Sequence, residues 1–270
     1  MNMVMRLVTA LGIAGLMCSA AQADVLDDIK KRGTLIVGVK ADYKPFGFRE
    51  PSGAIVGVEP DLAADVAKKL GVKLELVPVV SANRMEFLGQ GKIDLMIATM
   101  SDKPERRKVV QVIEPLYYSD AVNVLLKKGA GIKTWEDLKG KKLCGTTGAF
   151  YNKDVAQKYG PEIAAFDGSE KPLLALKGGD CIGYLYDQTF VGGKLTEDDW
   201  KGGYEMVLPG IMEAPWAMAV KLGETSFQTL LEGMHKDWMK SGRIIELETK
   251  WAVPPTDYAK RMHEAAKKGS

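Results

Sequence analysis

The sequence predicts an α/β fold whose sheets are mostly parallel. Three short apolar runs, 34–39, 72–77 and 93–99, have the length and composition of β-strands. The segment 58–70 between the first two carries apolar residues four positions apart, as an amphipathic helix does. Because strands and helices alternate, successive strands are expected to run parallel, and such sheets bind ligands beyond the carboxyl ends of their strands.

The first 23 residues have the pattern of a secretory signal peptide. A single charge at Arg6 precedes an apolar run over 7–17, and an Ala-Gln-Ala triplet at 21–23 supplies the small residues of a cleavage site. Cys18 leaves open a lipoprotein signal, although Met17 does not match the small residue expected before it. No other apolar run approaches the roughly 20 residues of a membrane span. The mature protein is therefore predicted to be exported and soluble.

The overall composition is that of an ordinary globular protein. Apolar residues make up 46% and charged residues 27%, with 37 basic against 35 acidic side chains. This balance gives no reason to expect a nucleic-acid or anionic-membrane partner. Beyond the signal peptide only Cys144 and Cys181 remain, and in an exported chain they favour a disulfide over a metal site. His235 and His263 lie elsewhere without ligand spacing, so no metal is expected.

Before the first long helix, the chain shows clear boundary signals. A short helix over 25–32 is predicted to end at Gly33, and Gly53 marks a turn. The segment 40–48 cannot be regular because Pro45 lacks a backbone donor. It places Tyr43 and Phe46 on a loop at the exit of the first strand, where they either pack in the core or contact a ligand.

The segment that follows strand 93–99 has the chemistry of a carboxylate receptor. Ser101 and Asp102 precede Pro104, which is a helix-start signal, and Arg106 follows within the first turn. A guanidinium can grip two carboxylate oxygens while hydroxyl and helix-start amide groups donate further bonds. The alternative is a surface helix with a solvated run of charges.

The second half of the chain repeats the strand-and-helix pattern. Extended residues 119–123 lead to a capping box at Thr134 and Asp137, and a strand over 142–145 runs into a loop at 146–150 that feeds a helix. That loop is either an anion-binding turn or an ordinary turn. A further strand ends at Asp187, whose carboxylate suits an ammonium group or, alternatively, caps a helix.

The C-terminal third is predicted to be mainly helical. Phe227, Leu230, Leu231, Met234 and Trp238 share one helical face before Gly242, and 243–251 forms a final helix. These apolar stripes are interpreted as core. The polar tail past Pro254 gives no structural signal.

The motif Gly-Lys-Ile-Asp at 91–94, with Ser101 five residues before Arg106, resembles the polar amino-acid-binding proteins that serve bacterial ABC importers. The resemblance covers nearly the whole mature chain. It implies a type II periplasmic-binding-protein fold, with two lobes of mostly parallel sheet flanked by helices and joined by two hinge crossings. Lobe 1 would comprise 24–120 and 217–270 and lobe 2 residues 121–216, with hinges near 119–124 and 212–218.

The same resemblance implies roles for individual residues. Arg106 would hold the α-carboxylate of an amino acid, Asp187 its α-ammonium, and Tyr43 its apolar stem. The loop from Thr146 through Gly148 would contribute backbone contacts, with Phe150 lining the pocket. The remaining predicted contacts lie just beyond strand ends: Lys40, Ser81, Arg84, Thr99 and Ser101.

The ligand's side chain is predicted from the charges at Lys40 and Arg84. Glutamate/aspartate-binding members of the family resemble this chain in having a basic residue at the position of Lys40 and a Ser-x-Asn-Arg segment like 81–84. A lysine there would repel a cationic side chain. An acidic amino acid is therefore expected first and a neutral polar one second. The resemblance also implies a periplasmic monomer that works with an inner-membrane permease and needs no cofactor.

Two other functions are compatible with the sequence. The same fold hosts dehydratases, which need a general acid in the cleft. Glu59, Glu86 and Asp94 are the carboxylates of the first α/β units, but each is explained equally well by its place on a helix face or near a helix start. An exported amino-acid sensor that reports to a receptor is the second alternative.

Overall fold

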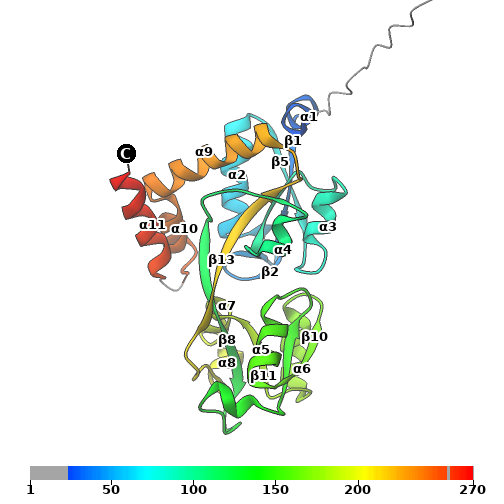
Figure 1. The fold of residues 1–270 in the computed structure, drawn as a ribbon, viewed down its shortest axis with the longest axis vertical. Helices are drawn as coiled ribbons and strands as arrows, with labels where there is room; N and C mark the ends of the chain where they lie inside the picture. Colours follow the sequence, from blue (N-terminus) through cyan, green and yellow to red (C-terminus); the bar gives the residue numbers. More distant parts are fainter. Residues whose placement is uncertain (1–23, 254–255, 270) are drawn as a thin grey trace, which may run out of the picture.

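The computed structural model describes residues 24–253 and 256–269 and has two lobes joined by two long strands (Figure 1). The connecting strands are β8 (Tyr118–Lys127) and β13 (Ile211–Val220), which run antiparallel to each other. They include residues 119–124 and 212–218, where the hinge crossings are predicted. The predicted signal peptide, 1–23, lies outside the described residues.

One large sheet runs through both lobes because β8 and β13 belong to each. Its strand order is β10-β9-β11-β8-β13-β6-β1-β5. In the first lobe β1 pairs in parallel with both β5 and β6. This part of the chain contains α1 (Val25–Arg32), β1 (Thr34–Val39), α2 (Val58–Leu70), β5 (Lys73–Pro78), α3 (Arg84–Gly89), β6 (Leu95–Ser101), α4 (Pro104–Arg107) and β7 (Gln111–Val112).

Strand β6 is buried along its whole length because both faces of the first-lobe sheet are covered. Leu95 and Ile97 belong to the main core, whereas Met96 and Ala98 belong to a second core on the other face. A continuous apolar run is what a parallel strand covered on both faces requires. The strand delivers Thr99 and Ser101 to the edge that faces the second lobe.

Glycines end the helices where the sequence predicts it. Gly33, Gly71 and Gly242 adopt the left-handed conformation directly after α1, α2 and α9, and their amides donate to carbonyls of the last turn. The capping box of Thr134 and Asp137 is also present. These local signals therefore fixed several element boundaries correctly.

The segment 40–48 is more regular than predicted. Short strands β2 (Asp42–Tyr43) and β3 (Gly47–Arg49) pair across the cis peptide before Pro45, and β3 continues the ribbon by pairing with β4 (Ile55–Val56). Pro45 lies between the paired residues, so its missing donor interrupts no ladder bond. Tyr43 is consequently held in a strand and fully buried.

The second lobe is a smaller α/β unit tied by a disulfide. Cys144 of β9 and Cys181 before β11 are joined, with their Cα atoms 5.7 Å apart, which confirms the predicted bond. The elements are η1 (Trp135–Leu138), β9 (Lys142–Thr146), α5 (Tyr151–Tyr159), β10 (Glu162–Phe166), α6 (Glu170–Gly178), β11 (Gly183–Asp187), α7 (Gln188–Lys194), α8 (Asp198–Lys201) and β12 (Tyr204–Glu205).

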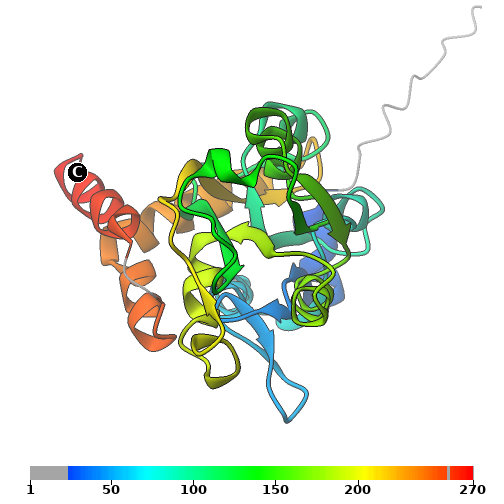
Figure 2. The same cartoon turned by 90° about the horizontal axis from the view of Figure 1, so that it is seen from below.

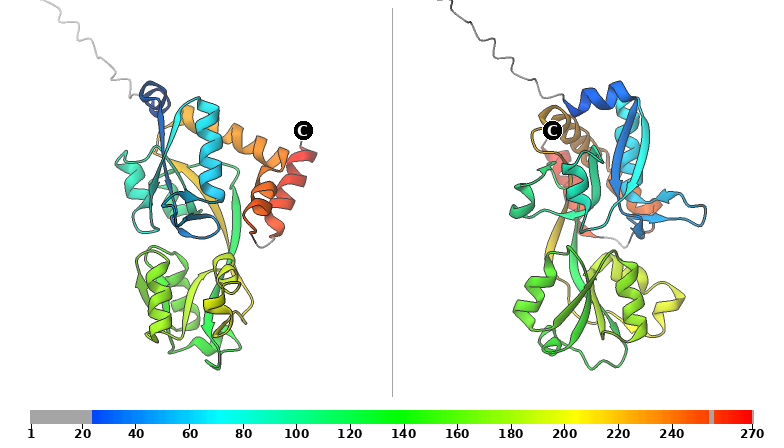
Figure 3. Two further views of the ribbon diagram at one scale, coloured as in Figure 1. Left: turned by 180° about the vertical axis from the view of Figure 1, so that it is seen from behind. Right: turned by 90° about the vertical axis from the view of Figure 1, so that its right-hand side faces the viewer.

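Three C-terminal helices cover the outside of the first lobe (Figures 2 and 3). They are α9 (Thr225–Ser241), α10 (Arg243–Lys250) and α11 (Asp257–Lys268). The tail gives no structural signal in the sequence, yet α11 forms there, buries Ala259 and packs Tyr258, Met262 and Ala266 against the core. Among the described residues, the model contains no helix that is long and apolar enough to cross a membrane.

Candidate functional site

A small pocket lies where the strand ends of the two lobes meet. Its volume is about 10 Å³, roughly the space of one water molecule. An amino acid is larger than this, so the lobes must separate before one can enter. The lining residues are Ser81, Arg84, Thr99, Ser101, Arg106, Ala149, Phe150, Tyr151, Tyr186 and Asp187.

Arg106 provides a buried cation on the first-lobe side. Helix α4 begins at Pro104, and this turn directs the guanidinium back toward the end of β6. Nη1 donates to the Ser101 carbonyl at 2.8 Å, and Nη2 donates to the Gly148 carbonyl of the second lobe at 3.0 Å. Burial lowers the pKa of Arg106 to about 10, so the side chain stays charged at neutral pH. The buried cation is therefore suited to a carboxylate.

Asp187 provides a buried anion on the second-lobe side. It ends β11 and precedes α7, and its carboxylate accepts a hydrogen bond from the Tyr43 hydroxyl of the first lobe at 3.1 Å. Burial raises the pKa of Asp187, and the hydroxyl of Tyr43 opposes that rise. Asp120 of β8 is also buried, and after burial itself the charge of Asp187 raises the pKa of Asp120 further. An ammonium group would relieve this clustering of negative charge.

Arg84 is a second buried cation in the pocket wall. It opens α3 and is only 2% exposed, and its Nη1 donates to the carbonyl of Ala98. Burial lowers its pKa. Its Nε has no hydrogen-bond partner in the described structure, so the guanidinium keeps unused donor capacity beside the pocket.

Thr99 brings its backbone, as well as its side chain, to the site. Its φ of 48° is in the left-handed region, which is rare for a β-branched residue and marks a functional position in many proteins. The Thr99 amide donates to Glu59 Oε1 at 2.6 Å, and the Tyr117 hydroxyl donates to the same oxygen at 2.6 Å. The carboxylate of Glu59 thus helps to hold the strained wall residue.

Seven of the eleven predicted ligand contacts line the pocket: Ser81, Arg84, Thr99, Ser101, Arg106, Phe150 and Asp187. They come from five separate segments of the chain and both lobes. The structure therefore brings together the charged residues that the sequence assigned to the two ends of an amino acid.

The other four predicted contacts lie behind or beside the pocket. Lys40 is fully buried, and its Nζ lies 3.1 Å from Asp42 Oδ1. The two groups form an ion pair, but their angles do not meet those of a hydrogen bond. Tyr43 reaches the site through Asp187. The hydroxyl of Thr146 is 2.6 Å from that of Tyr184 and donates to the Gly168 carbonyl, and the Gly148 carbonyl accepts from Arg106.

Three lining residues were missed from the sequence: Ala149, Tyr151 and Tyr186. Every residue of β11 is buried, so in the sequence Tyr186 could not be distinguished from an ordinary core residue. Tyr151 begins α5 directly after Phe150, and its place next to the predicted loop was the available signal. Both rings are buried, which raises the pKa of each phenol well above its usual value.

Direct contacts already join the two lobes around the pocket. Asp42 accepts from the Ser169 amide at 2.7 Å, and the Ser169 hydroxyl donates to the Asp42 carbonyl. At the mouth, Lys103 Nζ lies 3.6 Å from the centre of the Phe150 ring. With the Tyr43 and Arg106 contacts, these interactions hold the lobes in a closed arrangement.

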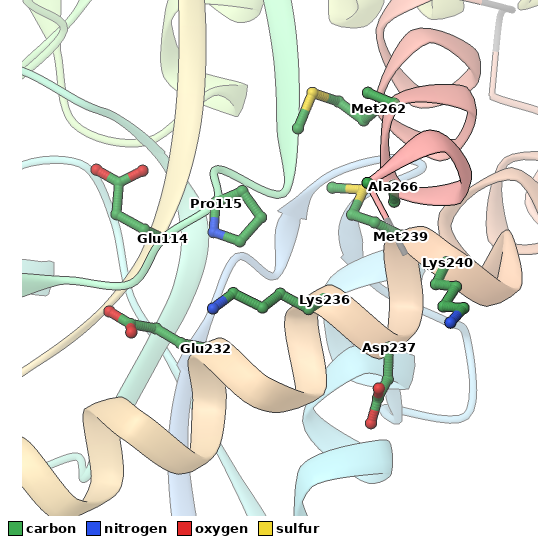
Figure 4. A pocket seen from close by; sticks show the side chains of 11 residues that line it. Glu114, Pro115, Glu232, Lys236, Asp237, Met239, Lys240, Met262 and Ala266 are labelled. Atoms are coloured by element: carbon green, nitrogen blue, oxygen red, sulfur yellow. The ribbon is translucent and has the colours of Figure 1, made fainter.

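A larger cavity, about 540 Å³, lies far from this site between α9, α11 and Pro115 (Figure 4). Met239, Met262 and Ala266 form its apolar part, whereas Asp237 and Lys240 point away from it. It lacks buried opposite charges, so we place the functional site in the smaller pocket. Within the described residues no group of three or more His, Cys, Asp or Glu side chains could hold a metal ion.

Two α/β lobes that close on a buried arginine and a buried aspartate define the class of two-lobe solute-binding proteins. The model for bacterial extracellular solute-binding proteins, family 3, matches residues 35–254. The chain therefore belongs to the bacterial extracellular solute-binding proteins of family 3.

The names of similar proteins mention different ligands. The glutamine-binding protein GlnH of an ABC transporter from Bacillus subtilis (strain 168) is 29% identical over 238 residues, which cover 86% of this chain and 85% of that protein. A mutant of ArgBP from T. maritima has a similar structure, with a TM-score of 0.78, 28% identity, and coverage of 84% of this chain and 98% of that chain. The ancestral amino-acid-binding protein AncCDT-1, a precursor of cyclohexadienyl dehydratase, has a TM-score of 0.75 and 29% identity. The match covers 85% of this chain and 99% of that chain.

Proposed function

We propose that this protein captures an amino acid between its two lobes and delivers it to an ABC transporter permease. The observation that supports the proposal is that Arg106 from one lobe and Asp187 from the other line the same buried pocket. The α-carboxylate would bind Arg106 and the α-ammonium Asp187. A zwitterion bridges the two charges, so its binding favours the closed arrangement of the lobes.

The α-carboxylate site has more than one donor. Arg106 supplies the charge, while Ser101 and Thr99, whose side chains carry hydroxyl groups, line the same pocket. To bind the ligand, Arg106 would exchange its contact with the Gly148 carbonyl for a charged partner. The exchange is favourable because a carboxylate carries a full negative charge and can accept two parallel hydrogen bonds from the guanidinium, whereas the carbonyl is neutral and accepts one.

For the ligand's side chain, we propose an acidic group that faces Arg84. The guanidinium has an unused donor and lines the pocket. Lys40 would add positive charge from behind the wall without direct contact, because its ammonium is paired with Asp42. A basic side chain would meet two buried cations, which is costly at short range. Aspartate or glutamate is therefore the proposed ligand, ahead of neutral polar amino acids.

The proposed setting follows from the family and from the predicted signal peptide. The protein would act in the periplasm as a monomer, and the closed form would be the signal that the permease recognises. It would bind its ligand without chemical change and without a cofactor or metal.

A thermal-shift screen against the twenty amino acids tests the proposal. A ligand at 100 times its dissociation constant adds about 2.7 kcal/mol to the free energy of unfolding. For a chain of this size, that corresponds to a rise in Tm of about 5–10 °C. We expect glutamate or aspartate to give the largest rise. A screen in which no amino acid raises Tm would refute the proposed function.

The similarity to AncCDT-1 supports one second candidate, a dehydratase that acts on a cyclohexadienyl substrate. Glu59, Asp120 and Asp187 are buried carboxylates whose raised pKa values would suit a general acid. Glu59, however, is separated from the pocket by the backbone of Thr99. Turnover of a prephenate-like substrate would favour the dehydratase over the binding protein.

A further inference from the structure

A group of buried charges lies directly behind the side-chain end of the pocket. Lys40 and Glu59 are fully buried, and Arg84 is 2% exposed. Lys40 pairs with Asp42, whereas Glu59 and Arg84 bind the two ends of one peptide group: the Thr99 amide donates to Glu59, and Arg84 donates to the Ala98 carbonyl. The carboxylates of Asp187 and Glu59 both act on the charge of Arg84. Of Lys40, Glu59 and Arg84, only Arg84 also lines the pocket. Its charge balance therefore depends in part on a group that the ligand does not touch.

The geometry of Glu59 fixes it in this position. Oε1 accepts hydrogen bonds from the Thr99 amide and the Tyr117 hydroxyl, both at 2.6 Å. Oε2 is buried and has no hydrogen-bond partner in the described structure. A buried acceptor without a partner is costly when it is charged, whereas a protonated oxygen carries no such charge. The site can thus hold Glu59 in either protonation state while Oε1 keeps its contacts.

We propose that Glu59 tunes which side chain the pocket prefers: neutral Glu59 leaves more of the Arg84 charge uncompensated and favours a carboxylate, and ionised Glu59 compensates more of that charge and favours the corresponding amide. This inference rests on the proposed function, because it assumes an amino acid held by Arg106 and Asp187. Glu59 is a positioning residue that acts through Arg84, and it makes no contact with the ligand.

The electrostatics place this change near neutral pH. Burial raises the pKa of Glu59 to about 7, and the groups that oppose the rise are the Tyr117 hydroxyl, the Thr99 amide, Lys40 and Arg84. Tyr117 itself remains a neutral phenol, because burial and Glu59 raise its pKa well above the usual value. As the pH falls through about 7, Glu59 loses its negative charge, and the net charge around the pocket becomes more positive by one unit. The change reverses as the pH rises. An anionic ligand strengthens proton binding to Glu59, so its binding takes up a proton when the pH is above 7.

Other buried carboxylates also titrate, but at the opposite end of the ligand. Asp187 and Asp120 lie near the proposed α-ammonium position, and burial raises the pKa of both. Their protonation weakens every amino acid to a similar extent, because each ligand has the same α-ammonium group. The ratio of affinities for an acid and its amide cancels this shared effect. Because Asp187 also acts on the charge of Arg84, the comparison with Glu59→Gln is what separates the contribution of Glu59.

Isothermal titration calorimetry with glutamate and glutamine, and with aspartate and asparagine, tests the inference between pH 5.5 and pH 8.5. The acid-to-amide affinity ratio is expected to fall as the pH rises, by about tenfold, the scale of one charge interaction across a buried site. In Glu59→Gln the ratio should be high and should vary less with pH, because the titrating carboxylate is gone, while glutamine keeps the acceptor oxygen for Thr99 and Tyr117. Asp94→Asn is the matched control, because Asp94 is another mostly buried carboxylate of the first lobe that pairs with Arg32. It should keep the pH dependence of the native protein.

Proton uptake by the native protein provides a measurement that needs no variant. Titration of glutamate at pH 8 in buffers of different ionisation enthalpy should show net proton uptake, whereas glutamine should show less. A ratio that is constant with pH and unchanged in Glu59→Gln, while the amino acids still bind, overturns the inference and leaves the proposed function intact. If neither pair of amino acids binds, the proposed function fails, and the inference fails with it.

Discussion

The hydroxyl of Tyr43 in the first lobe donates a hydrogen bond to the carboxylate of Asp187 in the second, at 3.1 Å. This bond crosses the boundary between the lobes and ends on the proposed ammonium site. It also stabilises the ionised form of Asp187, because it opposes the rise in pKa that burial causes. Closure of the lobes and ionisation of the binding carboxylate are therefore linked through one phenol.

Tyr43→Phe is expected to weaken ligand binding by about 1.5–3 kcal/mol, the usual worth of a hydrogen bond to a charged group. Without the hydroxyl, the pKa of Asp187 rises further and less of the carboxylate is ionised at pH 7. The loss should be smaller at pH 8.5, where Asp187 is ionised in both proteins. Calorimetry at the two pH values checks this, and equal losses at both would show that the hydroxyl does not act through the ionisation of Asp187.

Arg106→Ala is expected to reduce affinity by about 3–5 kcal/mol, as when one partner of a buried ion pair is removed. The neighbouring Arg107 gives a matched control, because it is 41% exposed and pairs with Asp102 and Glu114 on the surface. Arg107→Ala should leave affinity within about 0.5 kcal/mol of the native value, as for most surface substitutions. Similar losses in both variants would mean that Arg106 is not the carboxylate site.

The disulfide between Cys144 and Cys181 closes a loop with a sequence separation of 37. In the chain-entropy model, a loop of this size contributes about 4 kcal/mol to stability. Replacing both cysteines with serine should lower the free energy of unfolding by that amount in urea denaturation. The native protein should lose a similar amount after complete reduction, and an unchanged midpoint in both experiments would contradict the prediction.

His235 should make the protein sensitive to acid. It is fully buried, and burial lowers its pKa to about 4 from a usual 6.5. The unfolded chain therefore binds a proton between these values while the folded chain does not, so stability falls as the pH decreases from 6.5 to 4. His235→Gln should lose about 3 kcal/mol less than the native protein over this range. Urea denaturation at pH 4 and pH 7 measures the difference, and parallel losses would exclude His235 as the cause.

The sequence predicted local boundaries and the charged ends of the site well. Gly71 ends a helix because only glycine adopts the left-handed cap without strain, and this requirement is visible in the sequence. Arg106 and Asp187 lie at or after strand ends, where ligands of such sheets bind, but their assignment to the two ends of one ligand depends on the family resemblance.

The missed features depend on contacts between distant segments. The strand Glu162–Phe166 is short and lacks alternation, and it forms because β9 is available to pair with it. Helix α11 is mostly polar and is held by α9 and the core. The position of Lys40 also could not be predicted, because its side-chain direction depends on Asp42, which the contact with Ser169 holds in place.

The central claim is that the ligand's two α-groups bridge Arg106 and Asp187. Calorimetric titration of glutamate and of glutarate, which lacks the ammonium group, into the native protein and Asp187→Ala tests it most directly. The account predicts that the native protein prefers glutamate by about 3–5 kcal/mol, the cost of leaving a buried carboxylate unpaired, and that Asp187→Ala binds the two alike. Equal affinities in the native protein, or an unchanged preference in Asp187→Ala, would contradict it.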